Sequence, residues 1–300
     1  MIPSYPKVLT IGTRGTERLL EGDVLVQEKI DGSMFRWAVD AEGNIEFASH
    51  HAQIFPETAG DFAPAVAHIQ AQSSLLRDEY RGYTFYAEFM RGPRQNTLTY
   101  ERAPLGHLVL FDVCDVGGGF PTDPQFPGIC LVAPALGIEF AQTLYVGPAT
   151  MDDLRGLLDR RSQLGGPIEG VVVKNYAESI LLGGHVWPLF CKLVNAQYRE
   201  KHAANPDWQT GKSREAAYYD TFCTEARWHK AVQHLREKGT LQDAPQDIGP
   251  LMREIHADLL EEEEDNICDW LFRGHIKDLM RAAQRGFPEW YKDLLAKRIE

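Results

Sequence analysis

The sequence predicts an α+β protein in which antiparallel sheets with flanking helices are followed by a small all-helical domain. Strand patterns in the first two thirds follow one another through tight turns, without the strict strand–helix–strand alternation of a parallel sheet. After about Arg199 the strand patterns end and only helical periodicity remains. We therefore expect one domain over residues 1–200 and a second over residues 201–300.

The N-terminal region predicts a β-meander. Residues 7–22 form a helix or loop that leads into the first strand, and Gly32 and the Ala-Glu-Gly-Asn segment at 41–44 supply the turns between strands. The expected strands lie at residues 23–30, 34–39 and 45–48.

Helices and further strands alternate less regularly beyond residue 60. Ala65, Ile69, Leu75 and Leu76 are spaced to face a core from one helix, and Thr150 or Asp152 caps another. The expected helices lie at residues 64–80, 151–164, 214–238, 250–264 and 266–297, the last interrupted near Gly286. The expected strands lie at residues 83–90, 107–113, 170–174 and 190–194.

Composition narrows the class of protein. A chain of 300 residues with 44% hydrophobic residues can bury one large core or two smaller ones. No run approaches the ~20 apolar residues of a membrane helix, and no signal peptide pattern is present. Five scattered cysteines without a Cys-x-x-Cys pair predict reduced thiols in a cytoplasmic protein. A net charge of −12 argues against non-specific coating of nucleic acid but leaves room for a local basic patch.

The octapeptide at residues 26–33, Val-Gln-Glu-Lys-Ile-Asp-Gly-Ser, is the central candidate site. In a strand, Lys29 and Asp31 point to the same side. A lysine amine is nucleophilic near neutral pH only when its pKa is lowered. The neighbouring carboxylate of Asp31 would normally raise that pKa. This opposition is removed if Asp31 instead holds a hydrated metal ion or a ribose hydroxyl. Taken alone, the segment is also compatible with a surface strand that ends in an Asp-Gly turn.

Four later stretches carry further polar residues within apolar strands. Glu88 ends one strand, Phe111 lies within Leu-Val-Leu-Phe-Asp-Val-Cys-Asp, Glu169 and Lys174 bracket Gly-Val-Val-Val, and Lys192 lies in the last strand. Singly, these are equally compatible with solvated strand-end charges, a core phenylalanine and edge-strand lysines.

In order and spacing, five segments resemble motifs I, III, IIIa, IV and V of the covalent nucleotidyltransferases, whose catalytic domain is an ATP-grasp-like ligase fold. The segments are EKIDGS, FYAEFM, VLFDV, EGVVVK and FCKLVNAQYREK. The chain is most similar to ATP-dependent RNA ligases of the RNA ligase 2 (nick-sealing) type, and the resemblance covers about its first two thirds.

The resemblance implies a role for each matching residue. Lys29 attacks the α-phosphorus of ATP to form lysyl-AMP, which passes AMP to an RNA 5′-phosphate before a 3′-hydroxyl seals the strand. A magnesium ion (Mg2+, or Mn2+) suits the carboxylates. Glu88 and Glu169 face the ribose and the metal, and Asp31 helps to hold the water shell of the metal. Phe111 stacks on adenine, Lys192 contacts the α-phosphate, Lys174 serves a nearby phosphate, and Glu28 is a weaker candidate for the adenine pocket.

Two positions depart from the family pattern. Val194 stands where the nick-sealing ligases carry a second motif V lysine, and Ser-His-His at residues 49–51 stands where they carry an arginine. His50 can substitute as a donor, which makes activity more sensitive to pH because histidine titrates near neutrality.

The C-terminal helix carries a basic stripe, formed by Arg273, Lys277, Arg281 and Arg285. Residues four apart share a helix face, so the stripe can bind RNA phosphates, or it can be a solvated face paired with Asp278 and Glu289. Similar ligases carry a helical C-terminal domain, whereas DNA ligases and capping enzymes place a β-barrel after the same core.

The expected function is therefore an ATP-dependent RNA ligase that joins 3′-hydroxyl and 5′-phosphate ends, as in RNA repair. The alternatives are a nucleotidyltransferase that only adenylylates ends, and a catalytically degenerate RNA-binding protein of the same fold. We expect a monomer that does not associate with membranes.

Overall fold

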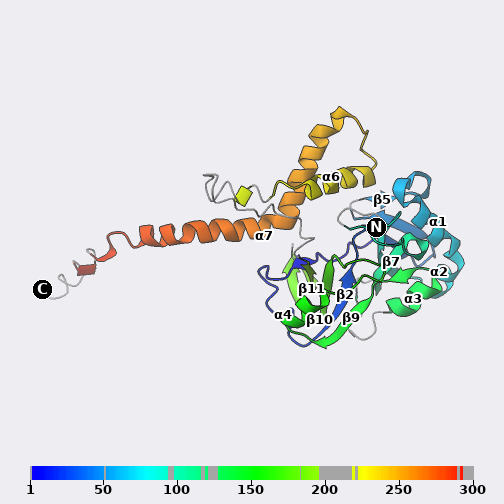
Figure 1. Cartoon of the computed structure of the whole chain (residues 1–300), viewed down its shortest axis with the longest axis horizontal. Coiled ribbons are helices and arrows are strands. Elements are labelled where there is room, and N and C mark those ends of the chain that lie inside the picture. The colour runs from blue at the N-terminus through cyan, green and yellow to red at the C-terminus, as the bar shows by residue number, and fades with distance from the viewer. Residues whose placement is uncertain are drawn as a thin grey trace. The chain divides into compact units, whose positions relative to one another are not determined.

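The computed structural model describes residues 2–50, 52–93, 98–115, 119–120, 128–182, 184–195, 218–219, 222–288 and 291–292 (Figure 1). Two compact units are present, Met1–Ile255 and His256–Glu300, and each is described by itself. The expected domain boundary near residue 200 lies outside the described residues and stays a prediction.

The first sheet, called sheet A, has five strands in the order β1-β11-β10-β2-β9. All neighbouring strands are antiparallel except β1 and β11. Its strands are β1 (Leu9–Thr10), β2 (Asp23–Lys29), β9 (Thr143–Pro148), β10 (Gly170–Leu182) and β11 (His185–Val194).

The second sheet, called sheet B, has six strands in the order β5-β4-β3-β6-β7-β8. Only β7 and β8 run parallel, so the antiparallel prediction is confirmed for both sheets. Its strands are β3 (Ser33–Val39), β4 (Ile45–Ser49), β5 (Gln53–Ile54), β6 (Tyr83–Phe89), β7 (Leu108–Asp115) and β8 (Glu139–Phe140).

Helices connect and cover the strands, and the expected helix at residues 64–80 is divided at Gln72. The α-helices are α1 (Ala63–Ala71), α2 (Ser73–Glu79), α3 (Ile129–Ala135), α4 (Met151–Leu157), α6 (Glu225–Glu237) and α7 (Ile248–Ala283). Short 3-10 helices lie at Pro56–Thr58, Gly60–Phe62, Leu105–His107 and Pro245–Asp247.

Each sheet buries one apolar face against its own helices. In sheet B, core residues such as Phe35 and Trp37 pack with α1 and α3, and in sheet A, Val26 and Val171 pack with Leu154 of α4. Because side chains alternate along a strand, the second face of each sheet carries the polar residues. The two polar faces approach each other at the ion pair between Lys174 and Asp112. Several candidate site residues, among them Lys29 and Glu88, lie on these faces.

Helix α4 begins as predicted and ends earlier than predicted. Thr150 forms a capping box with Asp153: the Thr150 hydroxyl accepts from the Asp153 amide at 3.2 Å, and the Asp153 carboxylate accepts from the Thr150 amide at 2.8 Å. The helix ends at Leu157 and not at residue 164, because the following segment turns to bring the Gln163 amide to the Glu28 carboxylate at 3.0 Å.

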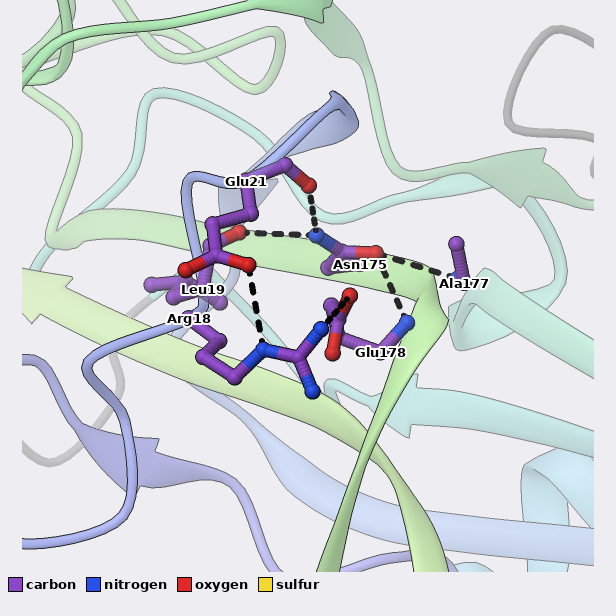
Figure 2. A network of polar contacts seen from close by, with 6 residues as sticks. All are labelled: Arg18, Leu19, Glu21, Asn175, Ala177 and Glu178. Atoms are coloured by element: carbon purple, nitrogen blue, oxygen red, sulfur yellow. Dashed lines mark hydrogen bonds and ion pairs between the residues drawn. The ribbon is translucent and has the colours of Figure 1, made fainter.

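Strand β10 continues past its expected end at residue 174 through an irregularity held by Asn175 (Figure 2). The Asn175 amide group donates to the carbonyls of Leu19 and Glu21 at 3.0 and 2.8 Å, and its carbonyl accepts from the amides of Ala177 and Glu178 at 3.0 Å each. Arg18 joins the same network by an ion pair with Glu178 at 2.8 Å. The fully buried amide thus has all four hydrogen bonds and ties the N-terminal loop to β10.

The C-terminal helices differ from the sequence prediction in length. Helix α6 begins after Thr224, whose hydroxyl accepts from the Arg227 amide at 3.2 Å; residues 214–217 of the expected helix lie outside the described residues. The stretches expected at 250–264 and 266–297 form one continuous helix, α7, which ends at Ala283, three residues before Gly286. No helix in the described ranges is both long enough and apolar enough to cross a membrane.

Candidate active site

Lys29 is the last residue of β2 and lies beside the start of β10. The register pairs Lys29 with Gly170, so Glu169 is adjacent, and the Lys29 Nζ donates to both Glu169 carboxylate oxygens at 2.7 Å. The Glu169 carbonyl accepts from the Asn195 amide at 2.8 Å, which fixes the start of β10. Gly170 is required here because a Cβ atom would lie 2.4 Å from the Leu193 carbonyl oxygen of β11.

The electrostatic environment of Lys29 favours its charged form. Burial lowers the pKa of Lys29, but the Glu169 carboxylate outweighs burial and, with Glu88 and Asp31, holds the pKa above the usual lysine value. An ammonium group has no lone pair for attack on phosphorus. Lys29 is therefore in a resting state here, and a reaction requires a change in its contact with Glu169.

Glu88 lies on β6, opposite Met34, and packs closely against the Gly32 turn. A Cβ atom on Gly32 would lie 3.1 Å from the Glu88 Cβ and 2.9 Å from the Phe89 carbonyl oxygen. The Glu88 Oε2 atom is buried and has no hydrogen-bond partner among the described residues. Burial raises the pKa of Glu88 to about 8, with Lys29 lowering it and Glu169 raising it further. Glu88 therefore carries a proton at neutral pH in this arrangement.

Asp31 is buried and holds the neighbouring loop. Its backbone amide donates to the Tyr100 hydroxyl at 2.8 Å, and its Oδ2 atom accepts from the Leu98 amide at 2.8 Å. Part of its hydrogen-bonding capacity therefore goes to protein backbone. Its expected role as a ligand of a hydrated metal ion stays a prediction.

Gln27 is a site residue that the sequence reasoning missed. It lies two residues before Lys29 on β2, so both side chains are on the polar face of sheet A. Gln27 is 1% exposed, and neither its Nε2 nor its Oε1 atom has a hydrogen-bond partner among the described residues. Burying an amide group without hydrogen-bond partners costs free energy, so the Nε2 and Oε1 atoms of Gln27 indicate a place for a polar ligand. Period-two alternation from Lys29 was the signal that could have found it.

Glu28 points to the opposite face of sheet A. Its Oε2 atom accepts from the Gln163 amide at 3.0 Å, and the Ser162 side chain is a further hydrogen-bond partner. The structure therefore does not bring Glu28 to the face that carries Lys29 and Gln27.

Lys174 lies on the Lys29 face but forms a separate buried cluster. It is 1% exposed, and its Nζ donates to Asp112 Oδ2 at 2.9 Å and to the Phe111 carbonyl at 2.8 Å. This ion pair joins sheets A and B, and Tyr5 completes it by donating to Asp112 Oδ2 at 2.8 Å. Lys174 follows Gly170 by four positions along β10, which corresponds to a distance of roughly 13 Å along the strand. The structure does not place Lys174 beside the Lys29 amine.

Phe111 borders both clusters. Its ring is partly buried against the cluster that contains Ile30 and Met90, and the Lys174 Nζ lies 5.5 Å from the ring centroid. Tyr5 meets the same ring edge-on at a centroid distance of 5.0 Å. The expected stacking on adenine is compatible with this position and stays a prediction.

The motif V strand lies beside β10 in sheet A. Lys192 pairs with Val172, which in turn pairs with Gln27, so these three residues form one row across the polar face. In the next row, Val194 pairs with Gly170, which pairs with Lys29. An aliphatic side chain therefore occupies the β11 position in the row of Lys29, where the nick-sealing ligases that the sequence resembles carry a lysine.

The remaining predicted residues lie outside this cluster or in the other unit. His50 is exposed and directly follows β4, and His51 lies outside the described residues. Arg273, Lys277 and Arg281 are exposed on α7, as is Arg285 beyond its end, and Arg281 forms an ion pair with Asp278 at 3.1 Å. Both interpretations of the basic stripe remain open.

Within the described ranges, no three His, Cys, Asp or Glu side chains form a ready-made metal site. The Glu169 carboxylate instead holds the Lys29 ammonium, and Glu88 acts on the same ammonium when it is ionised. The arrangement can therefore bind a cation between these carboxylates, hold a primary amine beside them, and satisfy a polar ligand at Gln27.

Comparison with known proteins gives one family match. Residues 22–186, more than half of the chain, match the family model of RNA ligase. No curated protein sequence matches the chain.

Solved structures of ligases are similar to the chain at low identity. A putative ATP-dependent DNA ligase from Aquifex aeolicus has 17% identity and a TM-score of 0.46, covering 89% of this chain and 66% of that one. An archaeal ATP-dependent RNA ligase has 15% identity and a TM-score of 0.47, with coverages of 85% and 62%. A lysine mutant of the Naegleria gruberi RNA ligase with AMP and manganese has 16% identity and a TM-score of 0.47, with coverages of 67% and 58%. The chain thus spans about three fifths to two thirds of the length of these proteins.

Proposed function

The chain belongs to the RNA ligase family, and from that premise we propose that it is an ATP-dependent RNA ligase that joins 3′-hydroxyl and 5′-phosphate ends through a lysyl-AMP intermediate. The observation that carries the proposal is the amine of Lys29 held 2.7 Å from both oxygens of Glu169. Glu88, whose Oε2 atom has no hydrogen-bond partner among the described residues, acts electrostatically on the same amine.

The first step uses the Lys29 amine as nucleophile. Its nitrogen forms a bond to the α-phosphorus of ATP while the bond from that phosphorus to the bridging oxygen breaks, and pyrophosphate leaves with the electron pair. Before the attack, the resting ammonium passes one proton to the Glu169 carboxylate, which is already in hydrogen-bond contact, and this frees the lone pair. The nitrogen loses its second proton to solvent as the bond to phosphorus forms. Binding of the triphosphate beside the ammonium also favours release of Glu169 from its ion pair with Lys29.

The later steps return Lys29 to its starting form. An oxygen of the RNA 5′-phosphate attacks the phosphorus of lysyl-AMP, the N–P bond breaks, and Lys29 takes up two protons to return to its ammonium form. The 3′-hydroxyl of the second strand then attacks the activated 5′-phosphorus and releases AMP. Glu88 and Glu169, next to the reacting amine, are placed to position the ribose and to exchange the proton.

The polar face of sheet A supports binding of the nucleotide along a line of residues. Gln27 offers an amide donor and acceptor to the nucleobase edge, and Phe111 offers a ring for stacking. Lys192, in the same row as Gln27, is placed to contact a phosphate. We assign ATP as the nucleotide on the family resemblance, and the Gln27 amide is compatible with an adenine edge.

The carboxylates fit a divalent cation. The Glu88 Oε2 atom is buried without a partner, and both Glu169 oxygens already contact a cationic group, the Lys29 ammonium. Glu88 and Glu169 would therefore hold a magnesium or manganese ion, with Asp31 nearby. When bound, such an ion neutralises charge that develops on the phosphates.

The test is covalent labelling with radioactive ATP and magnesium, followed by denaturing electrophoresis. We expect label on the wild type and none on Lys29→Ala or Lys29→Arg. Lys238→Ala is a matched control, because Lys238 is also ion-paired to a glutamate, Glu254, at 2.7 Å but is the C-cap residue that follows α6. A wild type that takes no label from ATP, or a labelled Lys29→Ala, contradicts the proposal. Parallel labelling with GTP identifies the nucleotide.

Val194 favours a second candidate, an enzyme that stops after adenylylating an RNA end. The strand position opposite Gly170 lacks the cation that the family supplies there. Supplying RNA with a 5′-adenylylated end separates the two candidates, because a ligase seals it to a 3′-hydroxyl end without ATP and an end-adenylylating enzyme leaves it unjoined.

A further inference from the structure

A cavity of about 370 Å³ lies between α6 and the ends of strands β3 and β6. Ser33 and Phe89, which are register partners in sheet B, form part of its wall. Ser33 follows Lys29 by four residues, and Phe89 follows Glu88 directly. Two residues of the cavity wall therefore follow Lys29 and Glu88 closely along the chain.

Helix α6 presents a polar face to this cavity. His229, Gln233 and Arg236 are spaced so that they lie on one side of the helix, and all three line the cavity. Gln233 hydrogen-bonds to Ser33 and, at 2.6 Å, to Glu237. The bond to Ser33 holds this helix face against the first residue of β3.

Three side chains that can be cationic surround the cavity: Arg91, His229 and Arg236. Arg91 pairs with Asp61 at 2.8 Å and Arg236 with Asp243 at 3.5 Å, and the two arginine side chains are 75% and 50% exposed. Exposed ion pairs of this kind contribute little free energy, so a ligand with several anionic oxygens can replace them. The planar guanidinium group matches a phosphate with two parallel hydrogen bonds.

In the free protein each arginine is balanced by one exposed carboxylate, Asp61 or Asp243, so a phosphate binds here by replacing these carboxylates as the partner of the guanidinium groups. Burial raises the pKa of the Glu237 carboxyl, the other acidic group of the lining, and so disfavours its charged form. In a chain with a net charge of −12, two arginines around one cavity are a local cluster of guanidinium groups. Phe62, Phe89 and Val232 add apolar surface to its lining.

We propose that this cavity binds the phosphate and terminal nucleoside of the RNA strand that is being joined, with Arg91 and Arg236 as the phosphate contacts. The inference rests on the proposed function and deepens it. The pyrophosphate tail of ATP shares the phosphate chemistry, but it has no apolar part to meet Phe62, Phe89 and Val232. A terminal nucleotide has both parts, and its phosphate must reach the Lys29 side of the cavity.

The test is the double variant Arg91→Gln/Arg236→Gln, with Lys238→Gln as control, because Lys238 directly follows α6 and is not in the cavity lining. Affinity for a fluorescent single-stranded RNA with a 5′-phosphate is measured by anisotropy at several salt concentrations. We expect the double variant to bind about tenfold more weakly and to lose roughly 1.4 from the slope of log affinity against log salt, about 0.7 for each lost phosphate contact. The control should match the wild type.

A second measurement separates the two phosphate sources. We expect covalent labelling by ATP to keep its KM within about twofold in the double variant, while sealing of adenylylated RNA falls. Unchanged RNA affinity overturns the inference, as does a raised KM for ATP with unchanged RNA affinity, which would assign the cavity to the triphosphate. Arg91→Lys/Arg236→Lys keeps the charges but not the planar guanidinium groups, so it should recover the salt slope and only part of the affinity. A slope that stays low with an unchanged thermal unfolding temperature also contradicts the proposal. Failure of the wild type to take label instead contradicts the proposed function and leaves the RNA affinity comparison interpretable.

Discussion

Replacing Glu88 by glutamine should stabilise the fold increasingly as pH rises. Burial raises the pKa of Glu88 to about 8 from an ordinary value of 4.5. The folded state therefore keeps this proton up to about pH 8, whereas the unfolded state loses it near pH 4.5. Because the folded state binds more protons between these values, this carboxyl lowers the free energy of unfolding as pH rises through that window. Glutamine keeps the shape and removes the titration.

The size of the effect follows from the pKa difference. The pKa difference between 4.5 and 8 corresponds to a maximum change of about 4.8 kcal/mol in the free energy of unfolding, at roughly 1.36 kcal/mol per pKa unit. Glu88 is partly exposed, and water relaxes around a charge at such a site, so we expect less than half of this ceiling. The stability gain of Glu88→Gln over the wild type should grow by about 1–2 kcal/mol between pH 5.5 and pH 8.5.

Urea unfolding followed by tryptophan fluorescence at both pH values measures this difference. Glu42→Gln is the control, because Glu42 is exposed in the turn between β3 and β4. The same Glu88→Gln protein should lose covalent labelling by ATP, since the proposed role of Glu88 needs an ionisable carboxyl. A gain in stability that is equal at pH 5.5 and 8.5 would refute the electrostatic reasoning.

Three further predictions concern neighbouring features. Gly170→Ala should destabilise the fold by about 1–3 kcal/mol in urea unfolding, because the new Cβ meets backbone atoms of β11 at 2.4 and 2.8 Å; a neutral effect would contradict the close approach. Lys174→Met should cost about 3–5 kcal/mol by leaving the Asp112 carboxylate buried and unpaired, and adding Asp112→Asn should restore much of the loss in thermal unfolding. Lys277→Glu/Arg281→Glu should weaken strand sealing several-fold with labelling by ATP intact, and an equal loss of both activities would count against an RNA-binding stripe.

Alternation and turn residues were sufficient to predict the strands around the central site. Strands β2, β3 and β4 follow short turns, and their period of two is set by neighbours in sequence. The extension of β10 beyond Lys174 was missed because Asn175 interrupts the period, and the compensating bonds come from the loop near Leu19. Helix α3 was missed because Ile-Cys-Leu-Val-Ala-Pro-Ala has weak helix propensity, and its helical state depends on packing against sheet B.

The site shows the same limit. The order of the motifs predicted Lys29, Glu88 and Glu169, and the structure brings these three together. Alternation along the strand already places Glu28 opposite Lys29. The distance of Lys174 from the amine depends on register and on the pairing of two sheets, which no local pattern encodes. The cavity beside α6 requires residues more than a hundred positions apart and could not be predicted.

The two hydrogen bonds between Glu169 and the amine of Lys29 also affect how readily this lysine reacts with chemical reagents. Acylating and carbamylating compounds consume unprotonated amines, and here both carboxylate oxygens hold the amine in its protonated form. The side chain is 26% exposed, so the shielding is electrostatic rather than steric. Surface lysines should therefore be modified before Lys29. A survey of the protein by amine-reactive probes would then miss Lys29, the proposed nucleophile.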